Sequence, residues 1–154
     1  MSYRVLGLSP EPFRPLYGLS DAELGAHGVQ RVTADARPGY PDRIELRDAE
    51  PGETLLLLSW THQPADTPYR ASHAIFVREG AERPHEGEAL PEAMRIRPLS
   101  LRAWSADGHM LDADLVDGAA AEATIRRLLA DERVAYLHAH YAKRGCYAAR
   151  IERA

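Results

Sequence analysis

The sequence predicts an α+β fold: a mostly antiparallel, curled β-sheet of about nine short strands, with one long helix and one short helix. Short segments of alternating or continuously apolar residues recur along the chain, separated by short turns, which is typical of antiparallel sheets. Only residues 119–131 have a clear apolar stripe at helical spacing. The length of 154 residues fits a single domain, which we expect to span residues 1–154.

The N-terminal half is expected to contain the short helix and the most hydrophobic strand. Residues 20–23 (Ser-Asp-Ala-Glu) have the spacing of a capping box, so the short helix is expected over residues 20–27. Gly28 is well placed to end that helix, because glycine adopts the left-handed conformation at low cost. The strands expected in this half cover residues 3–8, 29–34, 43–47, 54–61 and 71–78.

The C-terminal half is expected to contain a hairpin and the long helix. Asp107-Gly108 indicates a tight hairpin turn, because this pair tolerates positive φ angles. Residues 119–131 are rich in alanine and place Ile125, Leu128 and Leu129 in one stripe, so they are expected to form the long helix. The strands expected in this half cover residues 99–104, 109–116, 134–140 and 147–151.

Composition excludes several classes of protein. Lys and Arg total 19 against 23 Asp and Glu, a net charge of −4, which argues against a general nucleic-acid binder or a membrane-surface binder. No apolar run approaches the roughly 18 residues of a membrane span, and the N-terminus lacks the apolar stretch of a signal peptide. One cysteine fits a reducing compartment, so we expect a cytoplasmic protein. The sequence requires no cofactor and indicates no oligomeric state.

The end of the chain holds the best candidates for catalysis. His138 and His140 are two residues apart on an expected strand, so both point to one face, and Cys146 follows across a short turn. Lys143 and Arg144 lie in that turn, and a cation beside a thiol stabilises the nucleophilic thiolate. Cys146 is therefore a candidate nucleophile with His140 or His138 as its base. The alternative is that Cys146 packs as a small hydrophobic residue.

The same residues suggest a metal site. His138, His140 and Cys146, joined by His62 or His73 from a neighbouring strand, would form a nitrogen and sulfur ligand set suited to zinc. No C-x-x-C or H-E-x-x-H motif fixes such a site, so the histidines could equally be a hydrogen-bonded pair without a metal.

A second polar group lies around the connection between the two central strands. His62, Tyr69, Arg70 and His73 flank or occupy this proline-containing loop, and loops on a rigid sheet are common places for binding residues. Arg70 could pair with a carboxylate or a phosphate, and Tyr69 could stack on a ligand or donate a hydrogen bond to it. The alternative is that His62 and Arg70 only hold the connection in place.

Four stretches of the chain form a distinctive set: residues 55–64 (LLLLSWTHQP), 68–77 (PYRASHAIFV), 100–104 (SLRAW) and 143–150 (KRGCYAAR). Together they resemble a bacterial family known as domain of unknown function 1203. The resemblance covers essentially the whole chain, and its most specific parts are Pro-Tyr-Arg and Gly-Cys-Tyr-Ala-Ala-Arg. It implies a bacterial, single-domain protein and brings no activity with it.

Three hypotheses for function follow from these residues. The leading one is a small-molecule-binding domain whose polar pocket takes a small anionic ligand through His62, Tyr69, Arg70, His73, Lys143 and Arg144, near His138, His140 and Cys146. The second is a small hydrolase or transferase with Cys146 as nucleophile. The third is a zinc- or iron-binding domain.

Overall fold

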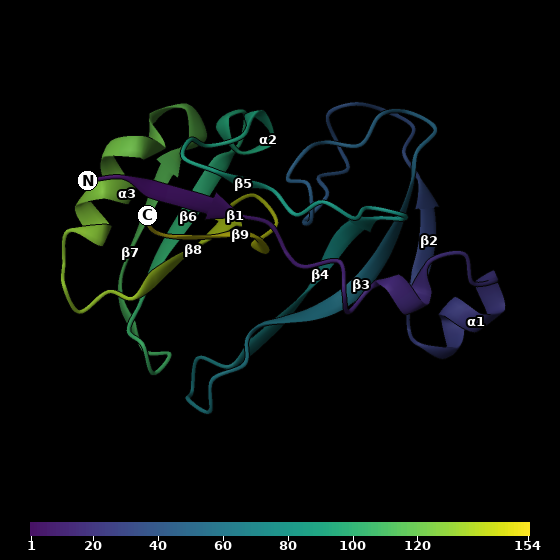
Figure 1. Cartoon of the computed structure of the whole chain (residues 1–154), viewed down its shortest axis with the longest axis horizontal. Helices are drawn as coiled ribbons and strands as arrows, with labels where there is room; N and C mark the ends of the chain where they lie inside the picture. Colours follow the sequence, from purple (N-terminus) through teal and green to yellow (C-terminus); the bar gives the residue numbers. More distant parts are fainter.

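The computed structural model describes residues 1–154 and contains nine strands in two antiparallel sheets (Figure 1). The six-stranded sheet has the order β5-β1-β9-β8-β6-β7, and the three-stranded sheet has the order β2-β3-β4. The larger sheet comprises β1 (Tyr3–Leu6), β5 (Glu86–Gly87), β6 (Pro98–Trp104), β7 (Met110–Asp117), β8 (Tyr136–Tyr141) and β9 (Cys146–Arg153). The smaller comprises β2 (Gln30–Thr33), β3 (Thr54–Gln63) and β4 (Ala71–Arg78).

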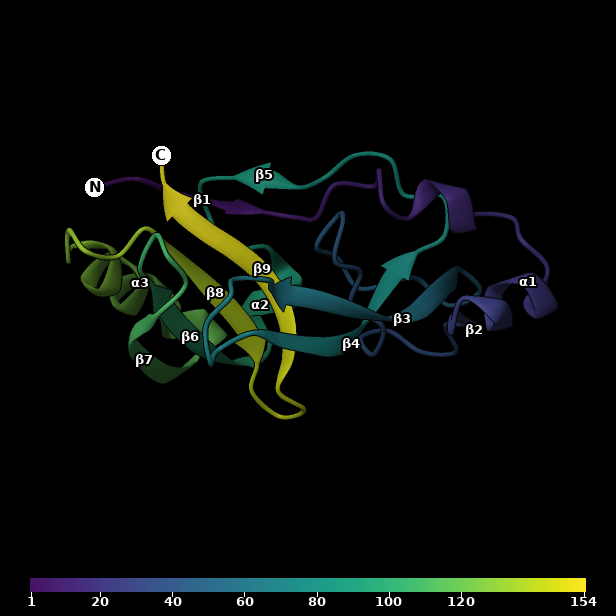
Figure 2. The same cartoon turned by 90° about the horizontal axis from the view of Figure 1, so that it is seen from below.

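The helical elements are short (Figures 1 and 2): η1 (Arg14–Leu16), α1 (Asp21–Ala26), α2 (Glu92–Arg95), η2 (Gly118–Ala120) and α3 (Ala121–Leu129). The predicted helix at residues 20–27 is confirmed as α1, where the Ser20 hydroxyl accepts from the Glu23 amide and the Glu23 carboxylate accepts from the Ser20 amide, both at 3.1 Å. Gly28 follows with φ +71°.

Two parts of the predicted architecture are wrong. The strands form two separate open sheets, not one curled sheet. The expected long helix over residues 119–131 is a 3₁₀ turn followed by nine α-helical residues. The α-helix ends at Leu129 because Arg153 of β9 donates to the carbonyls of Leu129 and Asp131, which replaces the next helical turn.

The predicted strand at residues 43–47 is also wrong, and the two-residue strand β5 was not expected. Residues 43–47 form a loop in which Leu46 has φ +55°, and the Asp42 carboxylate accepts from the Glu45 amide at 2.6 Å. Ile44 and Leu46 are both buried, but they pack in different hydrophobic clusters. The alternation of apolar residues at 43–47 therefore arises because Ile44 and Leu46 are buried in two separate clusters, not because they share one face of a strand.

Each sheet has its own hydrophobic core. The larger core lies between the six-stranded sheet and α3 and contains Leu101, Ile125 and Leu137. The second core packs β3 and β4 against the segment around α1, and it also receives Tyr147 from β9. β9 thus contributes side chains to both cores. No helix has the length and apolar character needed to cross a membrane.

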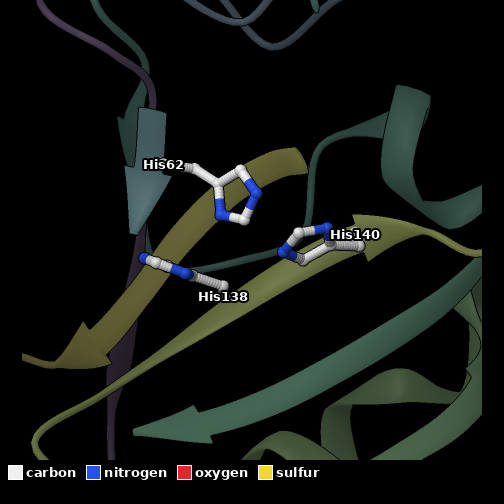
Figure 3. A group of neighbouring side chains, drawn as sticks. All are labelled: His62, His138 and His140. Atoms are coloured by element: carbon white, nitrogen blue, oxygen red, sulfur yellow. The ribbon is translucent and has the colours of Figure 1, made fainter. Parts of the chain in front are cut away.

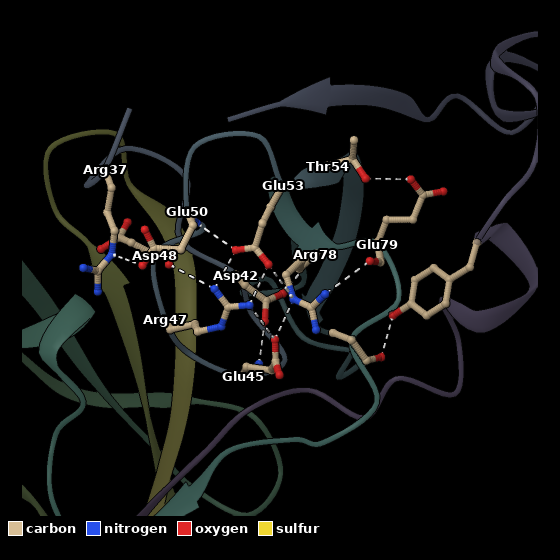
Figure 4. Close-up of polar contacts among 12 residues, drawn as sticks. Arg37, Asp42, Glu45, Arg47, Asp48, Glu50, Glu53, Thr54, Arg78 and Glu79 are labelled. Carbon is tan, nitrogen blue, oxygen red and sulfur yellow. Dashed lines mark hydrogen bonds and ion pairs between the residues drawn. The ribbon is translucent and has the colours of Figure 1, made fainter. Parts of the chain in front are cut away.

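A network of ion pairs holds the long loop between β2 and β3 (Figure 4). Arg47 binds Glu53 through two hydrogen bonds of 2.7 and 2.9 Å, and Arg78 binds Glu45 at 2.7 Å. Arg43 lies in the same loop and is 1% exposed, so its guanidinium is buried in the interior. That guanidinium reaches the turn between β8 and β9.

Candidate functional site

Three buried histidines from two sheets meet at one point (Figure 3). His138 and His140 lie on β8 of the large sheet, and His62 lies near the end of β3 in the small sheet. Gln63 fixes the end of β3 against β8 by donating to the Tyr136 hydroxyl at 2.9 Å. One ring nitrogen from each histidine lies within 4.8 Å of the other two, and no Asp, Glu or Cys belongs to the group. We call these three residues the histidine cluster.

Each ring in the histidine cluster has a buried nitrogen without a hydrogen-bond partner. These atoms are Nδ1 of His62, Nδ1 of His138 and Nε2 of His140. His140 Nδ1 lies 2.9 Å from the Gly145 carbonyl, which can only accept, so Nδ1 carries the proton and Nε2 keeps a lone pair. Because a buried polar atom without a partner costs about 1–3 kcal/mol, three such atoms in one place indicate a site for a missing partner.

Burial keeps the histidine cluster neutral. Desolvation lowers the pKa of His62 to about 4 and the pKa values of His138 and His140 to about 3. The Arg102 guanidinium lowers all three pKa values further. Neighbouring imidazoles act in the same direction: His73 on His62, and other cluster members on His138 and His140. Neutral imidazole is the form that offers a lone pair to a metal ion or to a hydrogen-bond donor.

Aromatic rings enclose the histidine cluster. Tyr147 stacks on His62 with ring centroids 5.5 Å apart and planes 7° apart, and Trp104 lies 5.7 Å from His138. The buried Trp104 indole N–H has no acceptor. Arg102 is paired with His138 across β6 and β8, and its side chain makes one hydrogen bond, of 3.4 Å, to Ser100. Two kinds of donor without a strong acceptor therefore lie on the same sheet face as the imidazoles.

Cys146 lies in a different place, on the opposite face of the β8–β9 hairpin. Its partner on β8 is Tyr141, whereas His140 pairs with Tyr147. The Arg43 guanidinium donates to Cys146 Sγ at 3.1 Å and to the Tyr147 carbonyl at 2.7 Å. A cleft of about 510 Å³ opens beside the thiol. Its polar lining consists of Arg43, His73, Arg97, Lys143, Arg144 and Cys146.

The structure divides the predicted site residues between these two places. His62, His138 and His140 come together in the histidine cluster, and His73, Lys143, Arg144 and Cys146 line the cleft. Cys146 is not part of the histidine cluster, and its thiol is hydrogen-bonded to Arg43 rather than to His138 or His140, so the expected base and nucleophile are not paired. In the expected ligand set of His138, His140 and Cys146, His62 takes the place of the thiol.

Tyr69 and Arg70, the other two predicted residues around the β3–β4 connection, belong to neither group. Tyr69 is exposed and packs edge-on against Trp104 at 5.6 Å, at the margin of the histidine cluster. Arg70 donates to the Pro64 carbonyl at 2.6 Å and so fastens its own connection.

Sequence reasoning missed the two arginines of the cleft, Arg43 and Arg97. The alternating pattern of residues 43–47 placed Arg43 on a solvated strand face, yet the loop buries it. Arg97 follows α2 and forms a two-bond ion pair with Asp48 at 2.6 and 2.9 Å. Both residues become recognisable only when the β2–β3 loop is placed against the end of β8.

Comparison with known proteins identifies the family. A family model described as a protein of unknown function (DUF1203) matches residues 39–153. The matched range contains the whole histidine cluster and every residue of the cleft. No curated protein and no solved structure matches the chain. The chain belongs to the DUF1203 family.

Proposed function

We propose that this protein binds a transition-metal ion of the zinc class through His62, His138 and His140. The observation that carries the proposal is the convergence of three buried histidines that bring one ring nitrogen each to within 4.8 Å of the others, where each ring also has a buried nitrogen without a hydrogen-bond partner. Three imidazoles with a fourth position for another ligand are a common donor set for zinc. Imidazole also binds copper, iron and nickel ions well, and competition experiments between these metals and zinc will rank their affinities.

The geometry needs only a small contraction to hold an ion. Zinc–nitrogen bonds of about 2.0–2.1 Å in a tetrahedral site place the ligand nitrogens about 3.3 Å apart. The three rings therefore have to close by at most about 1.5 Å, which side-chain rotation can supply. The Gly145 carbonyl already orients His140 through Nδ1, as second partners of metal-bound histidines commonly do.

The surroundings favour an anionic fourth ligand. A divalent ion here adds to the positive charge of Arg102, and no carboxylate belongs to the group to offset it. A bound hydroxide or another small anion would reduce that charge. It could also accept from the Arg102 guanidinium and the Trp104 indole, which lack strong acceptors in the protein.

Metal titration of the untagged, chelator-treated protein tests the proposal. Calorimetry with Zn²⁺ should give one ion per chain, and Co²⁺ should give the visible absorption bands of a tetrahedral site. His62→Gln and His140→Gln should each weaken Zn²⁺ binding by at least about 100-fold, because each removes one of three protein ligands. His73→Gln is the matched control, since His73 lies in the cleft, and it should leave binding unchanged.

Two results would contradict the metal proposal. One is the absence of binding at one ion per chain. The other is Zn²⁺ affinity that is the same in wild type and in folded His62→Gln and His140→Gln proteins, as judged by circular dichroism. In either case the unpaired nitrogens have another explanation.

The other two functional hypotheses receive different degrees of support. Nucleophilic catalysis by Cys146 lacks a neighbouring base from the histidine cluster, and His73 is the histidine that shares its cleft. Binding of a small anionic ligand is supported by the cleft rather than by Tyr69 and Arg70, which lie elsewhere.

A further inference from the structure

We infer that the cleft beside Cys146 binds a small organic anion, one with an apolar body and a single carboxylate, sulfonate or phosphate group. This site lies on the opposite face of the β8–β9 hairpin from the histidine cluster and does not depend on a metal. Its volume of about 510 Å³ falls within the roughly 300–1,000 Å³ typical of small-molecule sites.

The charge of the buried Arg43 is the strongest reason to expect an anion. Its side chain is 1% exposed, and its donors are directed to backbone carbonyls and to Cys146 Sγ. These contacts use three of the five guanidinium N–H donors, the two carbonyls carry no charge, and none of the ion pairs in the structure includes Arg43. Because buried charges are usually paired, the cleft beside Arg43 is a suitable place for an anionic partner.

The mouth of the cleft adds further positive charge. Lys143 and Arg144 are exposed in the turn between β8 and β9, and neither takes part in any ion pair. Arg97 also lines the cleft, but Asp48 neutralises it at 2.6 Å. No acidic residue lines the cleft, although the chain as a whole has a net charge of −4. The cleft is therefore a local positive site that would attract anions.

The rest of the lining determines the body of the ligand. Leu57, Ile75, Phe76 and Pro98 contribute to the wall of the cleft, and Tyr141 lies under the Arg43 guanidinium at 5.2 Å. An inorganic ion would leave this apolar surface in water. A ligand with an aromatic or aliphatic body covers it while its anionic group approaches the cations.

A pair of fluorescent probes distinguishes the contribution of the positive charge of the cleft from that of its apolar wall. 8-Anilinonaphthalene-1-sulfonate has an apolar body and one sulfonate, and N-phenyl-1-naphthylamine has the same ring system without the charge. With chelator-treated protein, so that the result is independent of metal binding, the sulfonate probe should bind at one per chain and more tightly than the neutral probe. The double variant Lys143→Glu/Arg144→Glu should weaken binding of the sulfonate probe by at least about tenfold and leave the neutral probe unchanged.

A control variant and a second measurement assign the effect to this cleft. Arg83→Glu changes an exposed arginine outside the cleft and should leave binding of the sulfonate probe unchanged. The same probe should slow alkylation of Cys146 by iodoacetamide in wild type and fail to do so in the double variant. Binding that is equal in the double variant and wild type, or a bound probe that does not protect Cys146, would overturn the inference.

Discussion

Acid sensitivity of the metal-free protein is the most direct consequence of the histidine cluster. The folded state holds the pKa of His62 near 4 and those of His138 and His140 near 3, whereas an unfolded histidine has a pKa of about 6.5. Below pH 6.5 the unfolded chain therefore takes up protons that the folded chain excludes. The three histidines therefore do not reduce the stability of the folded state above about pH 6.5, and they reduce it progressively as the pH falls from 6.5 toward their folded pKa values.

The expected loss can be worked out for the range from pH 7 to pH 5. Each histidine reduces the free energy of unfolding by about 2 kcal/mol over this range, and the three together reduce it by about 6 kcal/mol. The range also excludes the effects of the two carboxylates whose pKa values are lowered most strongly by arginine partners. Glu53 and Glu79, whose pKa values are lowered to about 2 by Arg47 and Arg31, lose their contribution only as the pH falls below about 4.5.

Urea denaturation at pH 7, 6 and 5, followed by circular dichroism in the presence of chelator, measures this loss. His138→Gln should remove about 2 kcal/mol of the pH dependence, because the substituted site no longer titrates. His27→Gln, at the exposed end of α1, is the matched control and should keep the wild-type dependence. A free energy of unfolding that stays constant from pH 7 to pH 5, or an unchanged slope in His138→Gln, would refute the reasoning.

Three further predictions concern stability and are measured by urea denaturation at pH 7. Arg97→Met should cost about 3–5 kcal/mol because it leaves the carboxylate of Asp48, which is 4% exposed, without its partner, whereas Arg133→Met at an exposed pair should cost less than about 1 kcal/mol. Gly118→Ala should destabilise by more than about 1 kcal/mol, because its Cβ would overlap a backbone carbonyl of α2. Ser20→Ala should cost about 1 kcal/mol through loss of the capping box of α1. Equal losses in Arg97→Met and Arg133→Met, or wild-type stability in Gly118→Ala or Ser20→Ala, would contradict these assignments.

The sequence predicted correctly those features that depend on residues close together in the chain. The capping box of α1 depends on Ser20 and Glu23, and both of its hydrogen bonds form as expected. The turn at Asp107-Gly108 joins β6 to β7, with φ +85° at Gly108. The two-residue spacing of His138 and His140 places both imidazoles on one face of β8.

Contacts between segments far apart in the sequence could not be predicted from such local patterns. Periodicity gives the face of a strand but not the sheet to which the strand belongs, so two sheets were read as one. His62 was offered as one of two possible partners of His138 and His140, beside His73, and only the contact between the end of β3 and β8 selects it. Arg43 was placed on a strand that does not form, so its contact with Cys146 had no local signal.

One irregularity in β9 explains why the thiol and the imidazoles lie on opposite faces. From Leu137 to Ala139, each residue of β8 pairs with β9 in a constant register, with Ala139 opposite Ala149. Continued without change, that register would place Ala148 opposite His140 and Cys146 on the histidine face. Instead the register shifts after Ala139, so that His140 pairs with Tyr147.

The shift leaves Ala148 of β9 without a partner on β8, which makes it the extra residue of a β-bulge. Ala148 packs in the larger core together with Ala149. A shift of one residue moves every later side chain of a strand to the other face, so it brings Tyr147 onto His62 and turns Cys146 toward Arg43. The spacing that suggested a catalytic pair of cysteine and histidine is compatible only with the unshifted register. The bulge at Ala148 is therefore the feature that separates one candidate site into two, a nitrogen-only cluster suited to a metal ion and a cationic cleft suited to an organic anion.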